Sequence, residues 1–246
     1  AQPFRQVEYV QRALEISLPC LAPLLHMALL VLPVAVVGNE QQALDICRFY
    51  NATSIHQTLQ QSALDDSKVL KLPCTYAGEL TERIAGQVRH FLGYLFVFCA
   101  SDAHVIPLHS TAVIYLSEGA EPRIDGALPN ANELCIETAR RLASVLAVGP
   151  QTAARAADGT SLKLRRALEE LKNRVLQELN VLRRAVRLAE VDHYAAAACA
   201  HALVTHPNRE LLLDILQREQ TYVHATEDAR DVLTMLREHF KMPIST

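Results

Sequence analysis

Apolar residues recur at helical spacing along most of the chain. From about residue 161, seven of them hold one side of a helix at steps of three and four: Leu164, Leu168, Leu171, Val175, Leu179, Leu182 and Val186. Such a stripe is typical of an amphipathic helix that packs one side against a core. Similar spacing predicts further helices over about 5–18, 40–50, 79–99 and 209–222. The sequence therefore predicts a mainly α-helical fold.

Capping residues and helix breakers divide this pattern into short helices. Asn130 and Glu133 form a capping-box pair, which predicts a helix that ends before Gly149 and Pro150. Other capping residues precede helices predicted over 55–64, 209–222 and 227–241, namely Ser54, Asn208 and Thr226. The helix from 161 either breaks near Asp192 or continues to Thr205. Short connections predict antiparallel helical hairpins that form a bundle or a short α-solenoid.

One segment departs from the helical pattern. Residues 111–116 are rich in β-branched and aromatic side chains, and glycine and proline follow them. This composition predicts a small extended or β insertion near 104–127. We expect an N-terminal helical half over 1–103, an insertion or linker over 104–129 and a C-terminal helical half over 130–246, which together could form one domain.

The stretch from Ile16 to Asn39 contains no charged residue, and residues 18–37 are almost wholly apolar. This run is long enough to span a bilayer of about 30 Å as a helix. However, three prolines interrupt it, and no excess of Lys or Arg flanks it. We therefore expect a buried core helix followed by an extended segment at 34–37, with a membrane-embedded anchor over 18–37 as the alternative.

The composition is that of a globular protein, since half of the 246 residues are hydrophobic and 21% are charged. The net charge of −3 gives the whole chain no strong preference for nucleic acids or anionic membranes. The six cysteines form no CxxC pair, so we expect free thiols in a reducing, intracellular compartment. The cytoplasm and an organelle such as the mitochondrion both fit this expectation.

The sequence contains no motif that would carry catalysis. It lacks the clustered glycines of phosphate-binding loops and the GxSxG turn of hydrolases. Glu190 and His193 have the spacing of a helical metal-ligand pair, but di-iron sites need a second such pair, and none is present. We therefore expect no catalytic residue, no metal and no cofactor, and a protein that is not an enzyme.

A basic segment lies on the helix predicted from 161. Between residues 163 and 187 the sequence has eight Lys and Arg and three Glu, which gives this segment a local net charge of +5. Seven of these are candidates for contact with RNA or an acidic partner: Lys163, Arg166, Lys172, Arg174, Arg183, Arg184 and Arg187. An ordinary solvated helix face carries charges in the same way.

Some apolar residues of this helix fall outside its leucine face, namely Leu162, Leu176, Val181 and Leu188. Apolar residues on several sides of a helix imply neighbours on several sides. The sequence therefore predicts that other protein subunits cover the apolar surface of 161–190 and of 18–37. We expect a helical scaffold or interaction subunit of a multi-protein assembly, with an RNA-contacting subunit of a ribonucleoprotein and a membrane-associated subunit as alternatives.

Overall fold

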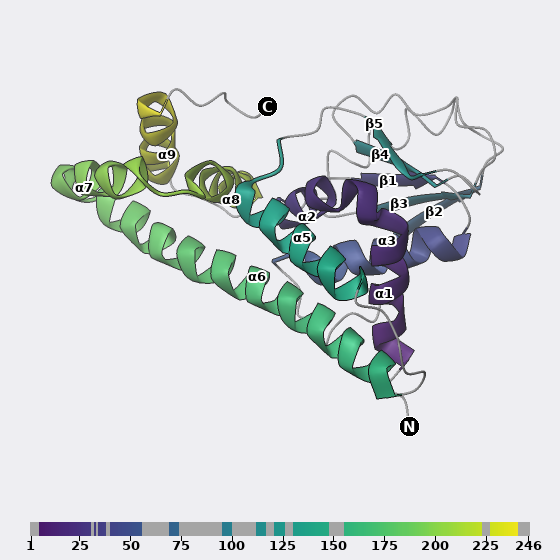
Figure 1. Ribbon diagram of the computed structural model, residues 1–246. Coiled ribbons are helices and arrows are strands. Elements are labelled where there is room, and N and C mark those ends of the chain that lie inside the picture. The colour runs from purple at the N-terminus through teal and green to yellow at the C-terminus, as the bar shows by residue number, and fades with distance from the viewer. Residues whose placement is uncertain are drawn as a thin grey trace. The chain divides into compact units, whose positions relative to one another are not determined.

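The computed structural model describes residues 5–30, 32, 34–37, 40–55, 69–73, 95–99, 112–116, 121–125, 130–147, 155–222 and 227–240. This part of the chain is mainly helical, as predicted, and one sheet accompanies the helices (Figure 1). The chain forms two compact units. The first comprises residues 1–131 and 135–170, and the second comprises residues 132–134 and 171–246.

In the first unit, helices α1 (Arg5–Ser17) and α2 (Leu21–Leu29), joined by a 3₁₀ turn (Leu18–Cys20), both pack against α3 (Glu40–Thr53). Apolar side chains from all three helices are fully buried, among them Leu14, Leu24, Leu25, Ile46 and Phe49. The Tyr50 hydroxyl of α3 lies 2.8 Å from the Met27 carbonyl oxygen and 2.6 Å from that of Leu32. These contacts join α3 to the end of α2 and to the chain that follows it.

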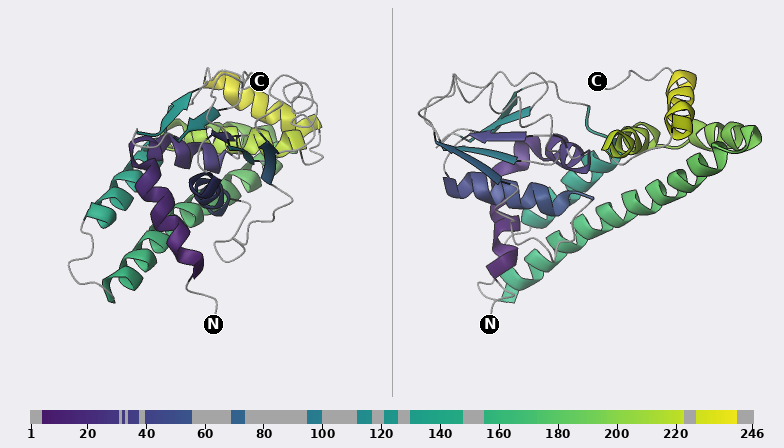
Figure 2. Two further views of the ribbon diagram at one scale, coloured as in Figure 1. Left: turned by 90° about the vertical axis from the view of Figure 1, so that its right-hand side faces the viewer. Right: turned by 180° about the vertical axis from the view of Figure 1, so that it is seen from behind.

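The sheet has five strands in the order β2-β3-β1-β4-β5. Their bounds are β1 Val34–Val37, β2 Val69–Pro73, β3 Leu95–Cys99, β4 Ala112–Tyr115 and β5 Arg123–Asp125. Strands β1 to β4 are parallel, with Val36 of the central β1 paired to Val97 and to Ile114. Strand β5 pairs antiparallel to β4. Helix α3 contacts β1 and β3 and therefore covers one face of the sheet (Figure 2).

Two predictions of extended structure are confirmed, and one helix prediction is wrong. Residues 34–37 are strand β1, and the antiparallel pair β4–β5 lies in the insertion predicted near 104–127. Residues 95–99, predicted to end a helix over 79–99, are strand β3. A parallel strand between two neighbours has a continuously apolar sequence, and so does a buried helix, which is why the two were confused. The predicted helix over 55–64 lies outside the described residues after Ile55.

Strand pairing joins the predicted insertion to the N-terminal part of the chain. Strand β4 pairs with β1, so the segment 104–129 contributes to the same sheet as residues 34–37. The division between the two compact units falls within the long helix α6 (Arg155–Ala189), after Glu170.

The apolar run 18–37 forms several elements rather than one: the 3₁₀ turn, α2 and β1. Its described side chains from Leu24 to Leu30 are all buried, whereas Leu18 is 39% exposed. The helical stretch Tyr9–Leu29 is the one part of the described chain long and apolar enough to cross a membrane, and 61% of its apolar window is buried within the structure. Core helices of folded domains have the same composition.

The second unit contains the end of α6, followed by α7 (His193–Val204), α8 (Arg209–Tyr222) and α9 (Glu227–His239). Helix α9 packs against α7 and α8, and Arg237 Nη1 donates to Asp214 Oδ1 at 2.7 Å. The bounds of α8 are those predicted from Asn208. The pairwise packing of these helices is consistent with a helical bundle, as the sequence predicted.

Helix α5 (Glu133–Ala147) begins two residues later than the predicted capping box of Asn130 and Glu133 implies, and its capping residue differs. The Leu134 amide donates to Asn132 Oδ1 at 2.9 Å, so Asn132 rather than Asn130 supplies the cap. Both asparagines precede an apolar helical pattern, and the spacing of Asn130 to Glu133 favoured the wrong one.

Candidate functional site

The apolar residues of helix α6 fall into two groups according to their solvent exposure. The seven residues of the predicted leucine face, Leu164, Leu168, Leu171, Val175, Leu179, Leu182 and Val186, are all buried. This confirms that the face is directed toward the protein interior. Leu162, Val181 and Leu188 are 67%, 68% and 61% exposed, and Leu176 is half-buried. These last side chains therefore lie outside the buried face, as the helical spacing indicated.

Four of the six exposed large apolar side chains described in the second unit lie where α6 gives way to α7, and the other two are Val204 and Met235. Val181 and Leu188 of α6 are joined by Val191, 84% exposed, and Tyr194, 88% exposed. The arginines Arg184 and Arg187 are exposed on the same turns of α6. We call these six residues the α6–α7 corner. Single exposed apolar residues are normal on protein surfaces, but a group of four within 14 residues marks a candidate interaction site.

The chain forms this corner because α6 ends at Ala189 and α7 starts anew at His193. The amides of Val191 and Asp192 both donate to the Leu188 carbonyl oxygen, at 3.2 Å and 3.1 Å. The Asp192 carboxylate then accepts a hydrogen bond of 2.8 Å from the Tyr194 amide and caps α7. The helix from 161 therefore breaks near Asp192, and the break leaves Val191 and Tyr194 exposed on either side of the cap.

The arginines of α6 fall into two classes according to the residue four positions later. Arg165, Arg166 and Arg174 pair with Glu169, Glu170 and Glu178 at 2.9 Å, 3.0 Å and 3.3 Å. The position four residues after Arg184 and Arg187 is occupied by Leu188 and Val191 instead. Across the described ranges, neither of these two arginines has an ion pair. The end of α6 therefore presents positive charge beside apolar surface.

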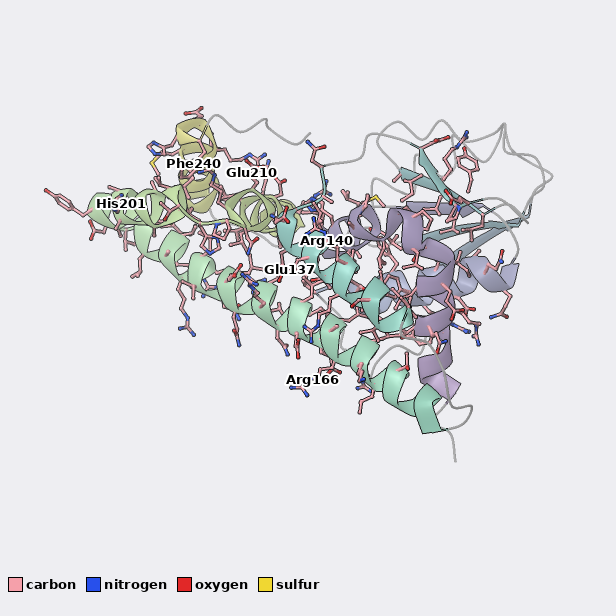
Figure 3. The ribbon with its side chains drawn as sticks, viewed as in Figure 1. Glu137, Arg140, Arg166, His201, Glu210 and Phe240 are labelled. Carbon is pink, nitrogen blue, oxygen red and sulfur yellow. The ribbon has the colours of Figure 1, made fainter. Side chains whose placement is uncertain are left out.

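The predicted basic candidates differ in accessibility. Lys163, Arg166, Arg174, Arg184 and Arg187 are exposed on α6, and Figure 3 shows Arg166 extending away from the helix. Arg183 is half-buried and donates to Asn180 Oδ1 at 2.7 Å.

Lys172 departs from the other candidates because it is only 5% exposed. Its position gave a signal of this: it follows Leu168 by four residues and precedes Leu179 by seven, which is the spacing of the leucine face. Lys172 therefore does not contribute to the exposed basic surface of α6.

Glu170 accepts hydrogen bonds from two arginines, Arg141 of α5 and Arg166 of α6. The Arg141 hydrogen bond, followed by that of Arg166, lowers the pKa of Glu170 below its ordinary value of 4.5. Both guanidiniums favour the ionised carboxylate. This cluster ties α5 to α6 in the first unit and offers no unpaired acid for chemistry.

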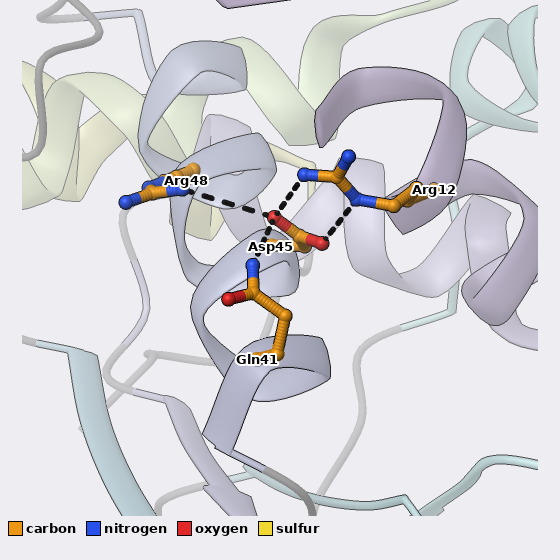
Figure 4. A network of polar contacts seen from close by, with 4 residues as sticks. All are labelled: Arg12, Gln41, Asp45 and Arg48. Atoms are coloured by element: carbon orange, nitrogen blue, oxygen red, sulfur yellow. Dashed lines mark hydrogen bonds and ion pairs between the residues drawn. The ribbon is translucent and has the colours of Figure 1, made fainter. Parts of the chain in front are cut away.

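A second polar network joins α1 to α3 (Figure 4). The Asp45 side chain is almost fully buried and accepts from Arg12 Nε at 2.7 Å and Arg12 Nη2 at 3.2 Å. Arg48 Nη1 lies 3.9 Å from Asp45 Oδ1, and Gln41 donates to the same oxygen at 3.3 Å. A buried carboxylate needs such partners, so the network satisfies Asp45 and fixes α1 on α3.

The groups that could hold a metal or act as nucleophiles are dispersed. Glu190 lies in the turn after α6 and His193 begins α7, so the helix break separates this pair. In the part of the chain that the structure describes, no three His, Cys, Asp or Glu side chains could share a metal ion. Burial raises the pKa of the Cys20 thiol to about 11 and that of Cys135 to about 12, and it also raises that of Cys199.

Sequence reasoning identified part of the α6–α7 corner and missed the rest. Val181 and Leu188 were found from the leucine periodicity, and Arg184 and Arg187 from the charge count. Val191 and Tyr194 were missed because their exposure depends on the break at Asp192, which the sequence left open. The Asp-x-Tyr cap after an Ala-Glu-Val stretch is the signal that would have found them.

Comparison with known proteins gives one similarity. Comparisons with curated proteins and with solved structures found no significant match. The sequence profile of the Njmu-R1-like protein family matches residues 151–242, which is less than half of the chain. The matched segment contains α6 to α9, and with them the whole α6–α7 corner. In this segment the chain is similar to the Njmu-R1-like protein family.

Proposed function

We propose that this chain is a non-catalytic helical interaction subunit of a multi-protein assembly and that it binds a partner subunit through the α6–α7 corner. One observation carries the proposal: four large apolar side chains of the corner, Val181, Leu188, Val191 and Tyr194, are between 61% and 88% exposed. Fully burying one side chain of the size of Val or Leu contributes about 1.5–3 kcal/mol. Covering all four contributes several times that amount before the cost of association is subtracted.

The remainder of α6 supports a partner outside the chain. The leucine face of α6 already packs into the protein interior, where Leu164, Leu168 and Leu179 are fully buried. The corner is therefore a second apolar surface on the same helix, and a helix that packs on one side needs only one. A specific interface buries about 800 Å² on each partner, and a few central apolar and aromatic anchors dominate its energy. The corner has the composition of such a centre.

The RNA alternative receives less support. The pairs Arg165–Glu169, Arg166–Glu170 and Arg174–Glu178 engage three of the eight basic residues between 163 and 187, and Lys172 is buried. Affinity for RNA rests on free cations along the phosphate backbone. Among the residues that the structure describes, Arg184 and Arg187 have no ion pair, and the exposed apolar side chains beside them have no counterpart on a phosphate backbone.

Size-exclusion chromatography of cell extract tests the proposal on the tagged full chain. The wild-type chain is expected to elute in a particle much larger than its own 27.3 kDa. The triple variant Val181→Ser/Leu188→Ser/Val191→Ser should shift to the position of the free chain. Leu162→Ser is the matched control because Leu162 is an equally exposed apolar residue of α6 outside the corner. A wild-type chain at monomer size, or a triple variant that stays in the particle, contradicts the proposal.

A further inference from the structure

We infer that the partner segment seated on the α6–α7 corner is an acidic amphipathic helix of another protein. This inference rests on the proposed function and adds the chemistry of the partner. It is carried by the arrangement of the apolar side chains and by the charges beside them.

The corner presents a short linear stripe. Val181, Arg184 and Leu188 follow one another on α6 at steps of three and four residues, the spacing of one helix face, and Val191 lies in the turn directly after the helix. At 1.5 Å per residue the helical part of this stripe, from Val181 to Leu188, is roughly 10 Å long, and Val191 extends it into the turn. A partner helix that matches it needs about three turns, with apolar anchors at the same three- and four-residue steps. Tyr194, at the start of α7, extends the apolar surface beyond the end of α6.

The charges select an acidic partner. On a helical projection Arg184 and Arg187 lie on one side of the line from Val181 to Leu188. For Arg165, Arg166 and Arg174 the chain supplies a glutamate four residues later. Here it supplies Leu188 and Val191, so the acids that would pair with Arg184 and Arg187 are left for a partner to provide. Glutamates flanking the apolar anchors of a partner helix would complete both pairs and exclude basic helices.

A second copy of this chain is a poorer occupant. A twofold contact places the same surface on both subunits, so Arg184 and Arg187 of one copy would approach those of the other. Asp192 is exposed, but its carboxylate is held at the start of α7 by the Tyr194 amide, and Glu190 is half-buried; neither occupies the position four residues after Arg184 or Arg187. Like charges across an interface are unfavourable. Charge complementarity therefore favours a different, acidic chain.

Two charge variants separate this inference from the proposed function in the chromatographic assay. Arg184→Glu/Arg187→Glu should reduce the assembled fraction roughly tenfold, because two interface pairs become like-charge contacts. Arg184→Lys/Arg187→Lys keeps the charge and should assemble like the wild type. If the triple serine variant leaves the particle while Arg184→Glu/Arg187→Glu remains, the acidic partner is ruled out and the proposed function survives. If the triple serine variant remains, the proposed function fails.

Photo-crosslinking then identifies the occupant. Val191→p-benzoylphenylalanine in the full chain places the crosslinker in the corner, and Leu162→p-benzoylphenylalanine is the matched control on the same helix. Mass spectrometry of the attached peptide is expected to find a segment with apolar residues at three- and four-residue steps and flanking Glu or Asp. The yield should fall roughly tenfold when Arg184→Glu/Arg187→Glu is added. Attachment to RNA, to a second copy of this chain or to a segment without acidic residues would overturn the inference.

Discussion

The side-chain amide of Asn208, at the start of α8, donates to Glu178 Oε2 of α6 at 2.9 Å. Asn208 is only 2% exposed, so this bond ties α8 to α6 inside the second unit. The sequence predicted Asn208 as the residue before α8, and its carbonyl oxygen does accept from the Leu212 amide. Its side chain bonds to Glu178, a tertiary contact that no local pattern indicates.

Asn208→Ala should therefore lower the free energy of unfolding by about 2 kcal/mol, because it removes a buried hydrogen bond to a charged acceptor. Urea unfolding followed by circular dichroism measures this loss. Asn208→Asp should lower the free energy of unfolding further, since the new carboxylate would then lie against the Glu178 carboxylate. Asn173→Ala is the control, because Asn173 is exposed on α6, the helix that carries Glu178. A loss equal to that of the control would show that the bond does not stabilise the unit.

Neighbouring apolar residues of α6 should differ sharply in their contribution to stability. Leu179 is fully buried, so Leu179→Ala should lower the free energy of unfolding by about 3 kcal/mol through lost burial and a cavity. Val181, two residues later, is 68% exposed. Val181→Ala should therefore change the free energy of unfolding by less than about 0.5 kcal/mol. The same unfolding experiment compares them. Equal losses would mean that Val181 is packed in the isolated chain and that the corner is not free.

Acid should remove the stabilisation that Glu170 provides. Its folded pKa is lowered by Arg141 first and by Arg166, so the contribution is fully present above the ordinary value of 4.5. It is lost as the pH falls through the lowered folded pKa. The difference in unfolding free energy between the wild type and Glu170→Gln should therefore shrink from pH 5 to pH 3. Glu137→Gln, an exposed glutamate of α5, is the control. A difference that is constant over this range would contradict the assignment.

Three buried cysteines, Cys20, Cys135 and Cys199, should resist alkylation in the native protein. Burial raises the pKa of each thiol, to about 11 for Cys20 and about 12 for Cys135. The thiolate is the reactive form, so N-ethylmaleimide at pH 8 should label these three slowly. Peptide mapping by mass spectrometry, with guanidinium-unfolded protein as the reference, measures each rate. Rapid native labelling of Cys135 would show that the start of α5 opens readily.

The sequence predicted features that depend on local periodicity and missed those that depend on distant pairing. The leucine face of α6 and the bounds of α8 are properties of consecutive residues, and both are confirmed. The parallel pairing of β1 with β3 joins residues about 60 positions apart, and no local pattern encodes it. For this reason Leu95–Cys99 resembled the end of a buried helix. Within the candidate site, the missed residues Val191 and Tyr194 depend on one helix break that periodicity alone cannot place.

Hydroxyl-radical footprinting of the full chain, free and within its assembly, tests most directly whether another molecule covers the α6–α7 corner. Oxidation of Tyr194 and Leu188 should fall at least about fivefold on assembly, because a partner covering anchor side chains excludes water from them. Leu162 should be oxidised equally in both states and serves as the internal reference. Tyr194 and Leu188 oxidised as fast in the particle as in the free chain would contradict the account.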